Sequence, residues 1–147
     1  MATTPDQHKA DAPDSVRCAV ITLSDPRTLE TDTGGQTVVD RLSATGHEVV
    51  YRDIIPDEPE QLRCLLEQFR DQSDIDCVLL TGGTGISARD QTFETVSELL
   101  TRSLPGYGEL FRMLSYQEIG PAAMLSRATG GLMKRTLLLT MPGSRAA

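Results

Sequence analysis

The fold is decided by the stretch CVLLTGGTG at residues 77–85, which begins as an apolar run and turns abruptly into a glycine-rich segment. A short apolar run that ends at glycines is typical of a strand buried on both faces, as in a parallel sheet covered by helices. Glycines allow backbone N–H groups to approach a ligand because no Cβ stands in the way. After Asp90, apolar residues at three- and four-residue spacings predict a helix. This strand–loop–helix order is the one that holds phosphates in α/β folds.

The glycine loop matches neither of two better-known phosphate-binding motifs. It lacks the Gly-Lys-Ser/Thr ending of a P-loop, and its glycines are not spaced as G-x-G-x-x-G. A glycine cluster can also build a tight connection that binds nothing. Both interpretations remain open from this stretch alone.

Composition and charge exclude several classes of protein. The chain has 147 residues, a formal net charge of −7, and lysine only at Lys9 and Lys134. An acidic chain without a basic stripe is a poor ligand for nucleic acid or for an anionic membrane. The three cysteines are far apart, so we expect neither a zinc site nor a disulfide framework. Cys18 and Cys77 lie in apolar runs and are expected in the core.

Residues 1–15 are rich in Ala, Thr, Asp and Pro and contain no apolar run. Such a segment buries too little apolar surface to fold, so we predict a disordered tail. It is neither a signal peptide nor a membrane span, and with reduced cysteines the cytoplasm is the expected compartment. We predict a single domain over residues 16–147.

Strand and helix patterns alternate from residue 16 to about residue 100. Strands are predicted at Val16–Leu23, at His47–Ile55 and in the apolar run that starts at residue 77, with helices at about 36–45, at about 59–72 and after residue 90. Asp32 or Thr33 is placed to cap the first of these helices, and Gly46 to end it. This alternation with short connections predicts right-handed crossovers and a mainly parallel sheet.

The pattern changes after residue 104. In order, it predicts a turn at Pro105–Gly108, a helix at Glu109–Ile119, a short helix at Pro121–Arg127, and strands at Ala128–Met133 and Arg135–Met141 that turn near Lys134, as an antiparallel pair would.

Four polar segments each follow a predicted strand: Ser24–Thr28, Pro56–Glu58, Thr81–Asp90 and Pro142–Ser144. Parallel strands end at the same edge of a sheet, and ligands of doubly wound folds bind there. We therefore expect these segments to converge and to form the site.

Seven motifs lie in or near these segments, in the order Thr22–Asp25, Asp32–Gln36, Ile55–Glu58, Thr81–Gly85, Arg89–Thr92, Pro105–Glu109 and Met141–Ser144. Together they resemble the molybdopterin-binding family of molybdenum-cofactor biosynthesis, over roughly Arg17 to Ser144. The segment FRMLSYQEIG at residues 111–120 looks most like the B-protein branch, close kin of the molybdopterin adenylyltransferases.

The resemblance implies a three-layer α/β/α fold that assembles as trimers or as dimers of trimers, and association with other proteins of the pathway. It implies binding of molybdopterin, a pyranopterin dithiolene with a terminal phosphate. In active members, ATP and Mg²⁺ are used to attach AMP to that phosphate, and the product then accepts molybdate or tungstate.

The resemblance also implies roles for individual residues. Asp57 and Asp90 match the family's functional aspartates, so they would be catalytic and would bind Mg²⁺ directly or through waters; the alternative is that both serve the N-termini of helices. Arg27 and Arg89 are candidate phosphate clamps. The residues expected to bind the cofactor and nucleotide are Ser24, Asp25, Thr33, Gly34, Thr81, Gly82, Gly83, Thr84, Gly85, Pro142, Gly143 and Ser144. For Ser24 and Asp25, a structural turn is the alternative.

The chain departs from the family pattern in two ways. The family usually continues beyond the Pro-Gly-Ser motif into a helical ending, whereas this sequence stops at Ala147. Gln91, and Phe93 at a position where proline is common, are milder departures that point to the B branch, in which adenylyltransferase activity is less assured. A non-catalytic molybdopterin-binding or scaffold oligomer is therefore the alternative function. A flavodoxin-like flavin module is disfavoured because Trp is absent and aromatics are scarce.

Overall fold

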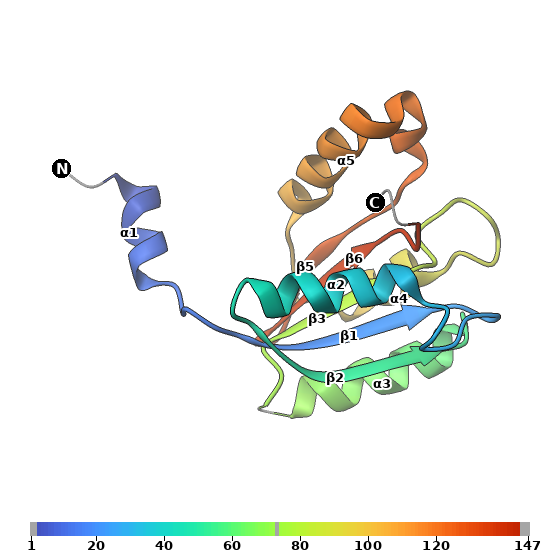
Figure 1. Ribbon diagram of the computed structural model, residues 1–147, viewed down its shortest axis with the longest axis horizontal. Helices are drawn as coiled ribbons and strands as arrows, with labels where there is room; N and C mark the ends of the chain where they lie inside the picture. The colour runs from blue at the N-terminus through green and yellow to red at the C-terminus, as the bar shows by residue number, and fades with distance from the viewer. Residues whose placement is uncertain (1–2, 73, 145–147) are drawn as a thin grey trace.

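The computed structural model describes residues 3–72 and 74–144, which form one six-stranded sheet with helices on both faces (Figure 1). The strands are β1 (Arg17–Leu23), β2 (Glu48–Ile55), β3 (Cys77–Thr81), β4 (Arg102–Ser103), β5 (Gly130–Met133) and β6 (Thr136–Met141), in the spatial order β2-β1-β3-β6-β5-β4. Strands β2, β1, β3 and β6 run parallel, and β5 pairs antiparallel with both β6 and β4. This confirms the predicted α/β class, the mainly parallel sheet and the antiparallel pair near the C-terminus.

The helices are α1 (Thr4–Asp11), α2 (Thr33–Ala44), α3 (Pro59–Asp71), α4 (Thr92–Leu99), α5 (Pro105–Ile119) and the 3₁₀-helix η1 (Gly120–Leu125). One face of the sheet packs on α3 and α4 through side chains such as Leu66 and Val96, and the other packs on α2 through Val38 and Leu42. The three layers predicted from the family resemblance are therefore present. Within the described residues, none of the helices combines the length and the apolar character of a membrane span.

Strand β3 is buried along its whole length, as its uninterrupted apolar run predicts. Val78 and Leu80 face one apolar cluster, and Cys77 and Leu79 face the other. Cys18 lies beside Cys77 in the parallel register. Burial raises the pKa of both thiols, that of Cys77 to about 12, so both behave as core residues, as expected.

The C-terminal third differs from the prediction at three places. The turn predicted at Pro105–Gly108 is wrong, because Pro105 is the first residue of α5. Proline suits this position, since an N–H there would have no hydrogen-bond partner within the helix. The short helix predicted at Pro121–Arg127 is a 3₁₀-helix that ends at Leu125. Strand β4 was not predicted because two residues carry no periodic signal. The turn near Lys134 is present, with a positive φ of 55° at that residue.

Helix α1 lies within residues 1–15, the segment predicted to be a disordered tail. Thr3 and Asp6 form a reciprocal capping box at its start, which favours a helical conformation there. The helix buries none of its residues, and Figure 1 shows it away from the sheet at the end of an extended segment. An isolated helix of 8 residues is marginal in water, so disorder of this tail in solution stays a prediction.

Candidate functional site

The segments that follow β1, β2, β3 and β6 meet at one edge of the sheet, because these four strands are parallel. The backbone N of Asp57, after β2, donates to Asp25 Oδ1, after β1, at 3.1 Å. The backbone N of Gly82, after β3, donates to the carbonyl of Met141 at 2.9 Å. Arg27 Nη1 donates to the carbonyl of Gly143, after β6, at 3.0 Å. The convergence expected from the sequence is therefore present.

The glycine loop after β3 requires glycine for both conformation and space. Gly82 and Gly83 have φ values of +104° and +66°. A Cβ on Gly82 would lie 2.4 Å from the carbonyl oxygen of Leu23. A Cβ on Gly83 would lie 2.1 Å from Thr92 Oγ1 and 3.2 Å from Asp57 Oδ1. The loop backbone thus packs directly against the end of β1, Thr92 and Asp57 and leaves no room for a side chain at either glycine.

The two predicted catalytic aspartates flank this loop. Besides Asp57 beside Gly83, Asp90 lies beside Gly85, where a Cβ would be 2.7 Å from Asp90 Oδ2. Asp90 Oδ2 also accepts a hydrogen bond from the backbone N of Ser87 at 3.0 Å. Two carboxylates and a run of loop glycines therefore share one small region, although more than thirty residues separate Asp57 from Asp90 in the sequence.

Neither aspartate is the N-cap residue of a helix. The N-cap of α3 is Glu58 and that of α4 is Gln91, each one residue later in the chain. The simple capping alternative for Asp57 and Asp90 therefore does not explain their placement.

The charged form of Asp57 is disfavoured in the free protein. Burial raises its pKa, and the negative charge of Asp90 raises it further, while Arg89 opposes the shift. Thr92 Oγ1, next to this group, is buried and has no hydrogen-bond partner among the described residues. Acidic groups that are short of positive charge, beside an unpaired hydroxyl, are typical of a site that takes up a cation or a polar ligand.

The donor set fits Mg²⁺ with phosphate ligands. Within residues 3–72 and 74–144, no group of three or more acidic, His or Cys side chains could enclose a metal. Mg²⁺ seldom needs such a cage, because it keeps several waters and binds one or two carboxylates together with substrate phosphates. Asp57 and Asp90 provide two such carboxylates.

Both arginines predicted as phosphate clamps make internal contacts. Arg89 pairs with Asp25 and with Glu58, each at 2.9 Å, and so links the loops after β1, β2 and β3. Arg27 bonds the carbonyl of Gly143, as described above, and links the first loop to the last. Each arginine thus holds loops together in this structure.

A buried polar network supports the start of α2. Asp32 is fully buried and accepts hydrogen bonds from Thr22 Oγ1 at 2.5 Å, from Arg52 Nη2 at 2.5 Å and from the backbone N of Gly35 at 3.1 Å. Burial opposes its ionisation, but these hydrogen bonds and the Arg52 charge outweigh burial and lower its pKa. Thr81 Oγ1 donates to Thr22 at 3.1 Å, so the network also reaches the end of β3.

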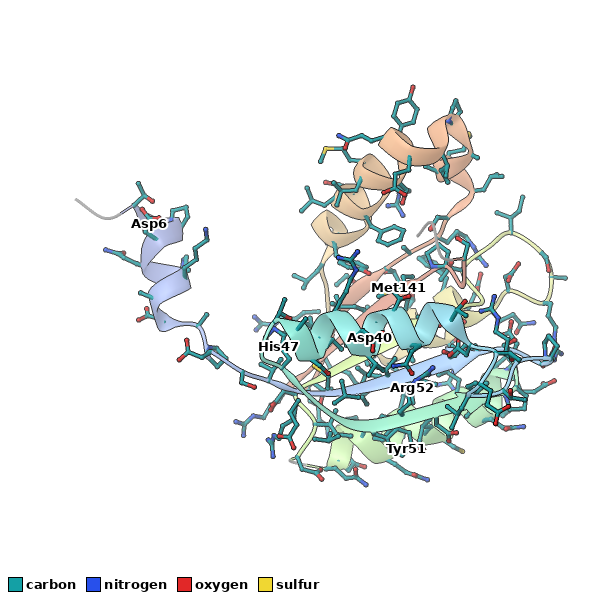
Figure 2. All side chains as sticks on the ribbon, in the orientation of Figure 1. Asp6, Asp40, His47, Tyr51, Arg52 and Met141 are labelled. Atoms are coloured by element: carbon teal, nitrogen blue, oxygen red, sulfur yellow. The ribbon has the colours of Figure 1, made fainter. Side chains whose placement is uncertain are left out.

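The sequence predicts Asp32 only as a helix cap and predicts no role for Arg52. Arg52 lies on β2 (Figure 2), twenty residues from its partner, and no local spacing connects the two. A signal was nevertheless present, because an arginine inside a strand of mostly apolar residues needs a partner.

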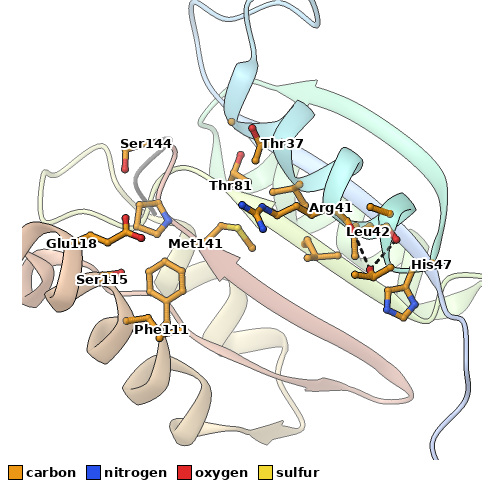
Figure 3. A pocket seen from close by; sticks show the side chains of 17 residues that line it. Thr37, Arg41, Leu42, His47, Thr81, Phe111, Ser115, Glu118, Met141 and Ser144 are labelled. Atoms are coloured by element: carbon orange, nitrogen blue, oxygen red, sulfur yellow. Dashed lines mark hydrogen bonds between the residues drawn. The ribbon is translucent and has the colours of Figure 1, made fainter.

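A cavity of about 740 Å³ lies between α2 and α5, over β3 and β6 (Figure 3). Its walls are mainly apolar, with Leu79, Phe111 and Met141 among them. Figure 3 shows the side chain of Arg41 pointing into it from α2. Four of the predicted ligand-binding residues line it: Gly34, Thr81, Pro142 and Ser144.

The cavity and the glycine loop lie next to each other at the sheet edge. A Cβ on Gly143 would lie 3.5 Å from the Cα of Gly82, and a Cβ on Gly34 would lie 3.4 Å from the carbonyl oxygen of Gly143. Of the other predicted residues, Thr84 is buried and Ser24 is half-buried, whereas two lie nearer the surface. Asp25 is exposed and paired, as described above, and Thr33 is exposed at the start of α2.

Comparison with known proteins agrees with this architecture. A family model described as "Probable molybdopterin binding domain" matches residues 19–147. Proteins named Molybdenum cofactor biosynthesis protein B are similar: that of Bacillus subtilis (strain 168) is 48% identical over 143 residues, which are 96% of this chain and 84% of that protein. That of Halalkalibacterium halodurans is 46% identical over 143 residues, 97% of this chain and 84% of that protein.

A crystal structure of a Molybdenum cofactor biosynthesis protein B superposes with a TM-score of 0.86 and 47% identity, covering 92% of this chain and 84% of the other. The match extends over nearly the whole chain, from the glycine loop to the residues that line the cavity. The chain therefore belongs to the molybdopterin-binding domain family of molybdenum cofactor biosynthesis, in the branch of the B proteins.

Proposed function

We propose that this protein binds molybdopterin and attaches AMP to its phosphate, using ATP and Mg²⁺, ahead of metal insertion. One observation carries the proposal: Asp57 and Asp90 flank the glycine loop at the carboxyl ends of the parallel strands, where the cavity between α2 and α5 also ends. Relatives named for molybdenum cofactor biosynthesis support the pathway. Adenylylation itself rests on the resemblance of the rim motifs to the adenylyltransferases.

In this reaction, a phosphate oxygen of molybdopterin attacks the α-phosphorus of ATP. The bond from that phosphorus to the bridging oxygen breaks, and pyrophosphate leaves with the electron pair. Two anions must meet, so charge neutralisation and alignment dominate the barrier. The backbone N–H groups of Gly83–Gly85 would hold phosphate oxygens, whereas that of Gly82 donates to the carbonyl of Met141. Asp57 and Asp90 would hold Mg²⁺, which when bound supplies positive charge beside the phosphates.

The cavity between α2 and α5 has the size and chemistry for the pterin. Small-molecule sites are usually about 300–1,000 Å³, mostly apolar, with a few polar groups that fix orientation. Apolar walls of this kind suit a ring system, while Thr81 and Ser144 stand at the end near the glycine loop. A molybdopterin whose ring system lies between the apolar walls would present its phosphate to the glycine loop.

We also propose that the protein works as a homotrimer or a hexamer, in the cytoplasm, alongside other proteins of the pathway. Large apolar side chains are exposed on α5 and η1, namely Leu110, Met113, Leu114, Tyr116, Ile119, Met124 and Leu125. So many large exposed apolar side chains on one short stretch of chain are uncommon on a monomer and support a subunit interface.

A second candidate function is a molybdopterin-binding scaffold without catalysis. It is favoured by the internal contacts of Arg27 and Arg89, because these leave the two expected phosphate clamps engaged elsewhere. Calorimetric titration with Mg²⁺-ATP distinguishes the two candidates, since a scaffold should have no nucleotide site.

The test of the proposed function is to incubate the protein with molybdopterin, ATP and Mg²⁺ and to measure adenylylated molybdopterin and pyrophosphate. We expect turnover in the wild type and in Asp40→Asn, a control on the exposed side of α2. We expect Asp90→Asn to lose turnover and to keep pterin binding. Tight pterin binding by the wild type without any turnover would refute the enzyme and support the scaffold.

A further inference from the structure

A single side chain from a distant part of the sequence holds both ends of the loop that carries Asp90. Arg127 Nε donates to the carbonyl of Gly85 at 2.7 Å, and its Nη2 donates to the carbonyl of Asp90 at 2.6 Å. The backbone N of Arg127 also donates to the carbonyl of Thr84 at 2.8 Å. The guanidinium of Arg127 therefore binds both ends of the loop at residues 85–90, and its backbone N binds the residue just before the loop.

The guanidinium is itself oriented by α4. Its Nη1 forms an ion pair with Glu94, and its Cζ lies 5.4 Å from the centre of the Phe93 ring. Arg127 thus uses three nitrogens on three different partners while packing on an aromatic face. An arginine can do this because its donors form a rigid planar fork. A lysine has one ammonium group and cannot bridge the two carbonyls and the carboxylate in the same way.

Besides the contacts of Arg127, the loop at residues 85–90 is held by the ion pairs of Arg89 with Asp25 and Glu58, whose side chains are all about half exposed. The tip of the loop is exposed, with Ile86 70% accessible. Inside the loop, Asp90 Oδ2 accepts from the backbone N of Ser87, so the position of this carboxylate follows the loop conformation. If the ends of the loop separate, Asp90 moves away from Gly85 and from the phosphate-binding glycines.

We propose that Arg127 is a positioning residue, which closes the loop at residues 85–90 and so places the Asp90 carboxylate to hold Mg²⁺ beside the phosphates. Arg127 acts on the backbone of the loop and not on the substrate. The catalytic consequence of this inference rests on the proposed function. The closed loop itself rests on the hydrogen bonds that Arg127 donates to the carbonyls of Thr84, Gly85 and Asp90.

The experiment compares Arg127→Lys with Arg63→Lys. Arg63 is a matched control, because it also pairs with a glutamate of α4, Glu98, and is similarly exposed, but lies away from the loop. Two measurements are made: hydrogen exchange of residues 85–91 in the ligand-free protein, and the steady-state kinetics of adenylylation. Glu94→Gln is a second variant that loosens the guanidinium while keeping Arg127.

We expect Arg127→Lys to speed exchange of residues 85–91 and to lower kcat by about 100-fold, the loss typical of a misplacement of about 1 Å. The KM for molybdopterin should stay unchanged, because the cavity residues are untouched. Glu94→Gln should shift both readouts in the same direction by less, and Arg63→Lys should shift neither.

Exchange and kcat at wild-type levels in Arg127→Lys would overturn the proposal. A lowered kcat with unchanged exchange would also overturn it, since Arg127 would then act directly on the substrate. If the wild type shows no turnover, the proposed function fails, and the exchange comparison alone decides whether Arg127 closes the loop.

Discussion

The Asp57 carboxyl group is held in surroundings that disfavour its charge. Burial, followed by the nearby charge of Asp90, raises its pKa above the ordinary value of 3.8. A carboxyl with a raised pKa in the folded state favours folding at low pH. That contribution is lost as pH rises from the ordinary value through the raised one. At neutral pH the ionised Asp57 therefore opposes folding, which is typical of a charge retained for function.

From this we predict that Asp57→Asn abolishes turnover without weakening the free protein. At neutral pH the variant should unfold at the same temperature as the wild type or a few degrees above it. The difference should vanish below the ordinary carboxyl pKa, where both side chains are neutral. Thermal unfolding over a pH series measures this, with Asp40→Asn as control. A clear loss of stability at neutral pH would mean that the Asp57 carboxylate has a stabilising partner.

At the scale of the element, the start of α2 depends on a charge that the solvent does not reach. Asp32 accepts from the N–H of Gly35 and pairs with Arg52, and its side chain is 0% exposed. Removing one member of a buried ion pair leaves the other without compensation, which typically costs about 3–5 kcal/mol. The segment that would suffer first contains Gly34, which lines the cavity.

We therefore predict that Asp32→Asn lowers the free energy of unfolding by about 3 kcal/mol or more, measured by urea denaturation at neutral pH. The lowered pKa of Asp32 gives stability that is present above 3.8 and is lost as pH falls through the folded value. The variant and the wild type should thus converge in acid. Asp76→Asn, which breaks a half-exposed pair, should cost about 1 kcal/mol or less. Equal losses in the two variants would contradict the prediction.

The elements also show how far a sequence alone can be interpreted. Strands β1 to β3 and helices α2 to α4 followed from apolar periodicity, because each buries one face or both. The start of α5 did not, because Pro-Gly-x-Gly is typical of a turn. Tertiary contact overrides that preference: a Cβ on Gly108 would lie 2.6 Å from the carbonyl oxygen of Ala128. Close packing of α5, rather than a turn, explains that glycine.

The same limit applies to the candidate site. The meeting of Asp57 and Asp90 was predictable, since both follow parallel strands that end at one edge. The partners of Arg52 and Arg127 were not predictable, because these contacts join residues 20, 37 and 42 positions apart. Strand order brings loops together, but it does not tell which buried or half-buried arginine fixes them.

At the scale of the whole molecule, two surfaces formed by the described residues differ in chemical character. The edge with the glycine loop is polar and acidic, and suits a ligand that arrives with a cation. The exposed face of α5 and η1 is apolar and lies on a helix that Figure 1 shows extending beyond the sheet. Arg127 lies just after η1 and reaches the loop, so the two surfaces are joined through one short segment.

We predict that charge placed on the exposed face of α5 breaks the assembly. Leu110 and Met113 are 60% and 52% exposed, so a chain that folds alone should tolerate glutamate at both positions. In an assembly, the same two charges would be buried without partners and would oppose association. Sedimentation velocity should show a trimer or hexamer for the wild type and a monomer for Leu110→Glu/Met113→Glu. Gln61→Glu, on an exposed position of α3, is the control and should keep the wild-type mass. A wild type that sediments as a monomer at all concentrations would contradict the prediction, because the apolar surface of α5 would then have another partner.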